Sequence, residues 1–189
     1  MSVEKHSEIK EKGGIYFFTT RVLGGNNIFI KKRYIDIIKN AYDFAEKKRN
    51  IKNLIWTIMP NHLHWIFKLD ESNDDPIPIY QYFKRHTARE TLQLLMHESQ
   101  MKPFEIVRFF RKCRYYTAEE LLRSFKIRNN YQLWERKPDL KLLYSSEFIR
   151  IKVNYIYENP FREPWTLVQD PQDYPFTYIN WDLINEFLE

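Results

Sequence analysis

The chain has 189 residues, of which 43% are hydrophobic, so it can bury the core of one domain but is short for two independent ones. Thirty Lys and Arg residues against 25 Asp and Glu residues give a formal net charge of +5, which suits an anionic partner such as a nucleic acid. A single cysteine excludes an intramolecular disulfide, and the sequence opens with neither a secretory leader nor a membrane-spanning stretch, so we expect a cytoplasmic protein with no membrane partner.

The first part of the chain predicts a strand, a helix and a strand hairpin. An apolar run over residues 15–20 has the composition of a strand, and apolar residues spaced three and four apart over 31–48 predict a helix. Two further strand-like runs, 54–59 and 62–69, are separated by Pro60-Asn61, a pair typical of a turn. These two runs therefore predict an antiparallel hairpin.

A second helix and an insert follow the hairpin. After a polar loop, apolar spacing predicts a helix from Ile79 to about Met96. Residues 102–130 mix aromatic and basic side chains and contain Thr117-Ala118-Glu119-Glu120, which resembles a capping box at the start of a helix. We interpret residues 102–130 as an inserted helical hairpin.

One more strand and one more helix complete the prediction. Residues 131–135 are a short strand candidate. Ser145 and its neighbours can cap a helix that must end near Asn159, because Pro160 disfavours helical geometry at the residue before it. The resulting order, β-α-β-β-α-β-α, indicates an α+β fold in one domain over residues 1–189, with its core over 13–180.

The second strand of the hairpin carries the pair His62 and His64. Side chains alternate between the faces of a strand, so both imidazoles lie on one face, while the apolar side chains between and after them lie on the other. Two imidazoles aimed at one point can ligate a metal ion, but such a pair is also found hydrogen-bonded without metal. A third ligand would have to come from an element packed on the same face.

The helix that ends near Asn159 can supply that ligand and a nucleophile. Tyr155 and Asn159 are four residues apart and share a helix face, whereas Tyr157 points almost oppositely, so Tyr155 is the tyrosine expected beside the metal. A phenol has a pKa of about 10 and attacks a phosphodiester slowly unless the phosphate is polarised. Both tyrosines could also be core residues, and Asn159 could simply be the last helical residue before Pro160.

Three segments in order resemble the single-tyrosine HUH transposases, specifically the REP-associated tyrosine transposase (RAYT) branch of the IS200-like family. They are Met59-Pro60-Asn61-His62-Leu63-His64, Tyr155-Ile156-Tyr157-Glu158-Asn159-Pro160 and Asp170-Pro171-Gln172-Asp173-Tyr174-Pro175-Phe176. The resemblance implies a ferredoxin-like core with an antiparallel sheet. It also implies cleavage and rejoining of single-stranded DNA beside imperfect hairpins through a 5′-phosphotyrosine, with Mg²⁺ or Mn²⁺ as cofactor.

The resemblance also implies roles for individual residues. His62 and His64 correspond to metal ligands, Tyr155 to the nucleophile and Asn159 to the third ligand. Residues like Lys84 and Arg85 line the DNA groove in the family, although a solvated helix face would look the same. The basic cluster of the insert matches either a DNA-binding surface with stacking rings or an ordinary amphipathic helix; it consists of Arg108, Arg111, Lys112 and Arg114.

The sequence therefore predicts a metal-dependent transposase that acts on single-stranded DNA. Two other functions remain open: a non-catalytic protein that binds DNA hairpins, and a metal phosphohydrolase that uses the same histidines with water as the nucleophile. The sequence does not distinguish a monomer from a homodimer.

Overall fold

The computed structural model describes residues 10–99, 110 and 113–188. At its centre is an antiparallel sheet of five strands in the order β6-β1-β3-β2-β7, and a separate two-stranded ribbon pairs β4 with β5. The strands are β1 (Ile15–Arg21), β2 (Ile51–Ile58), β3 (His62–Leu69), β4 (Lys126–Ile127), β5 (Asn130–Tyr131), β6 (Asp139–Leu142) and β7 (Thr177–Ile179). The helices are α1 (Lys32–Lys48), α2 (Ile77–Glu98), α3 (Ala118–Phe125), α4 (Ser146–Glu158) and α5 (Trp181–Asn185), with short 3₁₀ turns at Leu23–Gly25 and Pro171–Asp173.

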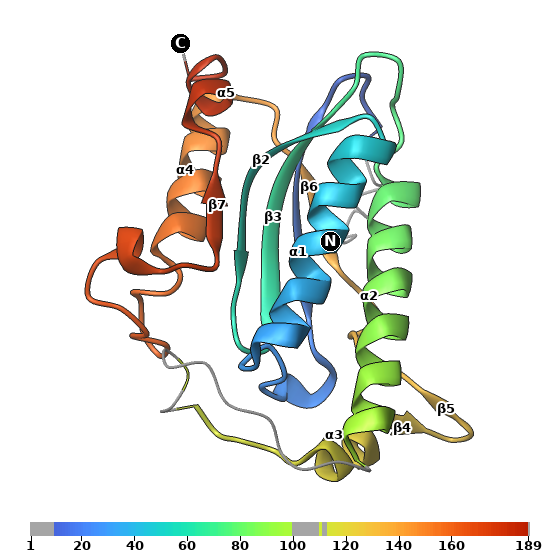
Figure 1. The fold of residues 1–189 in the computed structure, drawn as a ribbon. Coiled ribbons are helices and arrows are strands. Elements are labelled where there is room, and N and C mark those ends of the chain that lie inside the picture. Colours follow the sequence, from blue (N-terminus) through green and yellow to red (C-terminus); the bar gives the residue numbers. More distant parts are fainter. Residues whose placement is uncertain (1–9, 100–109, 111–112, 189) are drawn as a thin grey trace, which may run out of the picture.

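The predicted ferredoxin-like core is confirmed. Its elements follow the order β1-α1-β2-β3-α2-β6, and the strand order β6-β1-β3-β2 places the first and third of these strands in the middle. Helices α1 and α2 lie side by side on one face of the sheet, and α4 covers the other face (Figure 1). The central strand β3 is therefore held by hydrogen bonds to a neighbour on each side.

Alternation along β3 divides the core into two layers. Leu63, Trp65 and Phe67 belong to the larger apolar cluster beneath α1 and α2. Ile66 belongs to a smaller cluster that includes Ile156 of α4. Both faces of β3 are therefore covered by helices, and the face that carries the histidines is the one that α4 covers.

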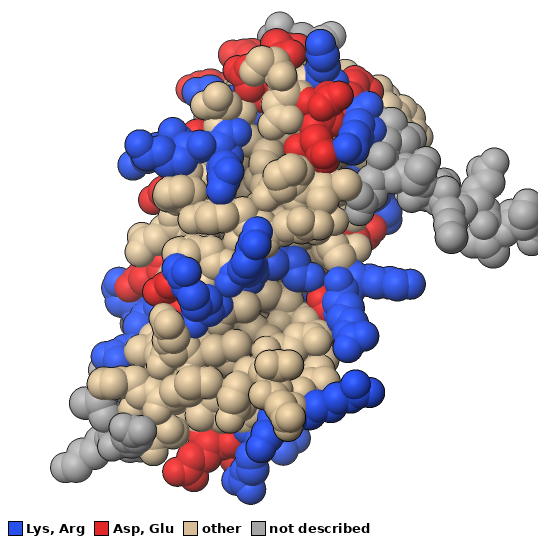
Figure 2. Space-filling model, turned by 90° about the vertical axis from the view of Figure 1, so that its right-hand side faces the viewer, with Lys and Arg blue, Asp and Glu red and all other residues tan. Residues whose placement is uncertain are grey.

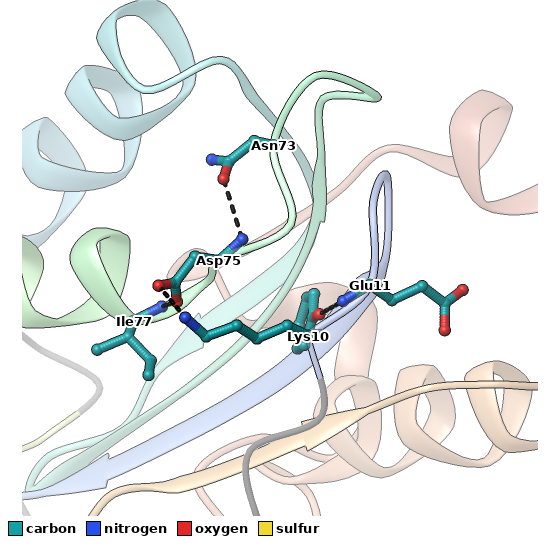
Figure 3. A network of polar contacts seen from close by, with 6 residues as sticks. Lys10, Glu11, Asn73, Asp75 and Ile77 are labelled. Carbon is teal, nitrogen blue, oxygen red and sulfur yellow. Dashed lines mark hydrogen bonds and ion pairs between the residues drawn. The ribbon is translucent and has the colours of Figure 1, made fainter.

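A polar network fixes the start of α2 beside the chain segment that enters β1 (Figure 3). The carboxylate of Asp75 accepts a hydrogen bond from the backbone N–H of Ile77 at 2.9 Å. It also forms an ion pair with Lys10 at 2.6 Å. Asn73 in turn accepts from the backbone N–H of Asp75 at 3.0 Å. These contacts satisfy backbone donors at the helix start, where no intrahelical acceptor exists.

The prediction of a sheet strand over residues 131–135 is wrong. Tyr131 lies in the separate ribbon, and Trp134 forms only an isolated bridge with Val22. The fourth strand of the core is β6, which pairs with β1 at the edge of the sheet. Its four residues alternate between exposed and half-buried, so it carries a weak apolar signal.

The insert is partly described. Its predicted capping box is confirmed: the side chain of Thr117 accepts from the backbone N–H of Glu120, and the Glu120 carboxylate accepts from the backbone N–H of Thr117. Helix α3 and the ribbon β4-β5 follow, whereas the first half of the predicted helical hairpin lies outside the described residues. Within the described parts, no helix has both the length and the apolar composition needed to cross a bilayer.

Candidate active site

The histidine pair lies at the start of β3, directly after the turn that joins it to β2. His62 and His64 point to the same face, and their ring centroids are 4.9 Å apart. Both are buried, with exposed fractions of 7% and 1%. The sheet therefore presents two imidazoles to α4 from its central strand, as the alternation of the sequence predicts.

Helix α4 brings Tyr155 and Asn159 to this face. The side chain of Ser145 caps the helix by accepting from the backbone N–H of Phe148, and Asn159 follows the last helical residue before Pro160. The ring of Tyr155 lies 5.0 Å from that of His64, and Asn159 Oδ1 lies 3.3 Å from His62 Nε2. Tyr157 instead contacts Trp181 at 6.1 Å between ring centroids.

The hydrogen bonds of Asn61 fix the tautomer of His62. The Asn61 amide nitrogen donates to the carbonyl of Gly25 at 2.8 Å, which leaves its Oδ1 to face His62 Nδ1, also at 2.8 Å. An amide oxygen only accepts, so His62 Nδ1 must carry a proton. In the neutral ring, Nε2 then presents a lone pair toward Asn159.

The Nδ1 atom of His64 also has a polar partner, on the neighbouring strand β1. Its Nδ1 is 2.7 Å from the hydroxyl of Thr19 on β1, and its Nε2 is buried without a hydrogen-bond partner among the described residues. A buried ring nitrogen without a partner costs free energy unless something binds it. When Nδ1 donates to Thr19, the Nε2 lone pair faces the same space as that of His62.

These groups fit a divalent cation. Burial lowers the pKa of His62 to about 4, with the charge of Arg21 acting in the same direction and the Asn159 contact against it. Burial likewise holds the pKa of His64 well below its usual range, so both rings are neutral and keep their lone pairs. The lone pair of His62 Nε2 and the Asn159 oxygen face one another, and a cation between them would be bound by both.

The separation of these two atoms agrees with a shared ion. Two ligands that are each about 2.1 Å from one cation, at bond angles of about 90–110°, are roughly 3.0–3.4 Å apart. The observed distance between His62 Nε2 and Asn159 Oδ1 is 3.3 Å. The described residues contain no group of three His, Cys, Asp or Glu side chains that could hold a metal, so the candidate centre is two imidazoles and an amide.

Two basic side chains near the candidate metal centre, Lys152 and Arg21, were not identified from the sequence. Lys152 lies over the ring of Tyr155, with Nζ 5.5 Å from the ring centroid, and over Phe17 at 4.8 Å. Burial lowers the pKa of its ammonium, as does Lys141, while Asp139 raises it. Arg21 lies opposite His62 in the pairing of β1 with β3. Lys152 is three residues before Tyr155, and this spacing places the two side chains on the same helix face, so the sequence carries a signal for Lys152.

Of the predicted DNA-binding residues, the two on α2 lie away from the histidines. Lys84 and Arg85 lie on α2, on the opposite side of the sheet, and Lys84 donates to the backbone carbonyl of Glu135 at 2.7 Å. Burial lowers the pKa of Lys84, and Glu135 acts against this. Arg114 is exposed, with its guanidinium 4.8 Å from the ring centroid of Tyr116. The remaining three predicted residues, Arg108, Arg111 and Lys112, lie outside the described residues.

Comparison with known proteins identifies relatives of the whole chain. A REP-associated tyrosine transposase of Escherichia coli K12 is 23% identical over 172 residues, which cover 91% of this chain and 80% of the relative. A Haemophilus influenzae protein that is also described as a REP-associated tyrosine transposase is 22% identical over 175 residues, which cover 91% of this chain and 83% of that protein. No protein-family model matches the chain.

The fold has a solved counterpart. A structure of a REP-associated tyrosine transposase bound to a REP hairpin matches with a TM-score of 0.62 and 20% identity, covering 99% of this chain and 88% of that one. These findings agree with the resemblance carried by the three sequence motifs. In sequence and in fold, the chain is a relative of the REP-associated tyrosine transposases.

Proposed function

We propose that this chain cuts and rejoins single-stranded DNA beside imperfect hairpins, with Tyr155 as the nucleophile and a divalent cation at His62, His64 and Asn159. One observation carries the proposal: α4 places a tyrosine and an amide oxygen against the two buried imidazoles of the central strand. The four groups come from two segments far apart in the sequence and converge on one space. Such a convergence of metal ligands and nucleophile suits phosphoryl transfer.

The reaction exchanges one phosphodiester for another. The Tyr155 oxygen forms a bond to phosphorus as the bond from phosphorus to the 3′-oxygen breaks, and the phenolic proton leaves with solvent or the departing oxygen. The products are a 5′-phosphotyrosine and a free 3′-hydroxyl. When a 3′-hydroxyl attacks the phosphotyrosine, the strand is joined and the phenol is restored, with no nucleotide cofactor consumed.

The cation and the protein divide the work. Bound at this site, Mg²⁺ or Mn²⁺ supplies a Lewis acid that neutralises charge on the phosphate oxygens. The Lys152 ammonium beside the Tyr155 ring contributes a positive charge on the nucleophile side. Thr19 and Asn61 hold the imidazoles in orientation through their Nδ1 atoms, so the ligands are arranged before the cation binds.

A DNA hairpin as substrate is supported by the solved relative, which is bound to a REP hairpin. The chain has an excess of basic over acidic residues, which favours a polyanion. Lys84, Arg85 and Arg114 stay candidates for phosphate contacts, as do Arg108, Arg111 and Lys112.

One experiment tests the proposed function. The protein is incubated with a labelled single strand that contains an imperfect hairpin and flanks, in the presence of Mn²⁺, and resolved on a denaturing gel. We expect a covalent protein–DNA adduct that Tyr155→Phe abolishes. Cleavage without an adduct would instead indicate a hydrolase, and binding without cleavage would indicate a non-catalytic hairpin-binding protein.

A further inference from the structure

A groove lies between α2 and the ribbon β4-β5. It consists of two adjoining hollows of about 480 and 600 Å³ that share Tyr131, Gln132 and Arg136. Hollows of this size accommodate a stretch of a polymer or a small organic molecule rather than a single ion. We call this feature the ribbon groove. Its lining includes Lys84 and Arg85 from α2, Arg128 and Tyr131 from the ribbon, and Arg136 from the segment after it.

The lining of the ribbon groove is basic. Among the described residues, four cationic side chains and no acidic side chain line it, and the nearby Glu135 offsets part of the charge of Lys84. None of the four forms an ion pair with another residue in the described part of the chain. In Figure 2, which views the molecule from the side where α2 and the ribbon lie, Lys and Arg side chains form a band across the middle of the face. A groove of this kind attracts phosphates.

An aromatic ring lies among these charges. The side chain of Tyr131 is 41% exposed and lines both hollows. A tyrosine beside converging cations can stack on a nucleobase whose neighbouring phosphates the cations contact. In a duplex the base faces are already stacked on one another, so this arrangement fits an unpaired segment.

The floor of the ribbon groove is fixed before any ligand binds. The Trp134 indole donates to the hydroxyl of Thr87 on α2 at 3.0 Å, and the Gln132 amide donates to the Trp134 carbonyl at 2.7 Å. Lys84 donates to the backbone of Glu135 at 2.7 Å. A floor tied to α2 at two points and braced by a third hydrogen bond within itself loses little freedom on binding, which favours affinity.

The same segment connects the ribbon groove to the candidate active site. The backbone N–H of Glu135 donates to the carbonyl of Arg21 at 2.9 Å, and Arg21 lies opposite His62 between β1 and β3. The ribbon and the start of β3, which carries the histidines, therefore lie toward the same end of the sheet (Figure 1). A strand leaving the active site can reach the ribbon groove around this end.

We propose that the ribbon groove binds an unpaired segment of the DNA substrate, with phosphates at Arg128 and Arg136 and one base stacked on Tyr131. This inference rests on the proposed function, because it takes its ligand from there. It assigns DNA contacts to residues of the ribbon and the segment after it, none of which belongs to the candidate metal centre.

Binding is measured without metal and with the Tyr155→Phe protein, so that cleavage does not interfere. The probes are a fluorescent DNA hairpin with single-stranded flanks and the same stem and loop without flanks. We expect Tyr131→Ala to weaken binding of the flanked probe on the order of tenfold, since one stacked base is lost. Tyr131→Phe should bind like the parent, because it keeps the ring. The matched control is Tyr144→Ala, which removes a tyrosine that is 80% exposed and lies before α4.

The charges are tested by the salt dependence of the same binding. Replacing Arg128 and Arg136 by Ala should reduce the slope of log affinity against log salt by about 1.4, because each single-strand phosphate contact contributes about 0.7. Lys47→Ala with Lys48→Ala makes the same change of net charge at exposed positions in the last turn of α1 and should leave the slope unchanged.

Two results would overturn the inference. One is equal binding of the flanked probe by Tyr131→Ala and its parent, with an unchanged salt slope in the double arginine variant. The other is an equal loss of affinity for flanked and unflanked probes, which would mean that the ribbon contacts the paired stem. Neither result touches the proposed function, which depends on whether the protein with Tyr155 intact forms the covalent adduct with Mn²⁺.

Discussion

Replacing Thr19 by valine should weaken metal binding without removing any ligand. Valine has nearly the shape of threonine, so the substitution deletes one hydroxyl at a position that is only 9% exposed. That hydroxyl is 2.7 Å from Nδ1 of His64. Without it, His64 loses the contact that orients its ring.

The size of the effect follows from this contact. Loss of a group that orients a metal-ligating histidine typically lowers metal affinity by about 10–100-fold, which corresponds to roughly 1.4–2.7 kcal/mol. The valine protein should also lose roughly 1–3 kcal/mol of unfolding free energy, because the buried Nδ1 is left without a partner. Both changes are large enough to measure.

The assay is calorimetric titration of the metal-free protein with Mn²⁺, together with urea unfolding. Thr20→Val provides the matched control: it is the adjacent residue, its side chain points to the other face of β1, and its buried hydroxyl has no hydrogen-bond partner among the described residues. The control should bind Mn²⁺ like the unaltered chain and be no less stable.

Equal Mn²⁺ affinity for Thr19→Val and the unaltered chain would refute the argument that the Thr19 hydroxyl orients His64 for metal binding. A loss of equal size in Thr20→Val would also refute it, since the effect would then come from β1 as a whole rather than from the histidine.

Four further outcomes are expected. Tyr155→Phe should abolish the covalent DNA adduct while keeping hairpin affinity, and Tyr157→Phe should form the adduct normally on the same gel. Mn²⁺ should support cleavage at lower concentration than Mg²⁺, because two imidazoles suit it better, and EDTA should stop the reaction; full activity after metal removal would contradict the ligand assignment. Lys152→Gln should lower the single-turnover cleavage rate on the order of 10–100-fold with unchanged DNA affinity. Lys31→Met should cost roughly 3 kcal/mol in urea unfolding, because it leaves the buried Glu98 with only the longer 4.0 Å contact to Arg33 in place of its 2.9 Å ion pair, and a second change, Glu98→Leu, should restore much of this.

The histidine strand and the tyrosine helix could be predicted because local rules determine them. The turn at Pro60-Asn61 sets where β3 begins, and the observed bounds, His62–Leu69, are those predicted. The cap at Ser145 and the proline at 160 bracket α4 in the same way. Helix periodicity then separates Tyr155 from Tyr157, and the structure has them on different sides, facing His64 and Trp181.

Other features depend on contacts between distant parts of the chain. The hydroxyl of Thr19 meets His64 across 45 positions, and no local pattern marks a threonine in an apolar strand as such a partner. Strand β6 has four residues at a sheet edge that alternate between exposed and half-buried, so its apolar pattern is weak, and the sequence instead predicts a strand over residues 131–135. The ribbon groove is formed by α2 and the ribbon together, and neither segment alone indicates it.

The orientation of Tyr157 limits the stoichiometry of the proposed reaction. Its ring lies against Trp181, so Tyr155 is the one tyrosine that α4 turns toward the histidines. Each molecule can then hold a single DNA end covalently at a time. Excision of a segment needs two cuts, so one molecule must complete two successive rounds, releasing the first end before it takes the second, or two molecules must each hold one end.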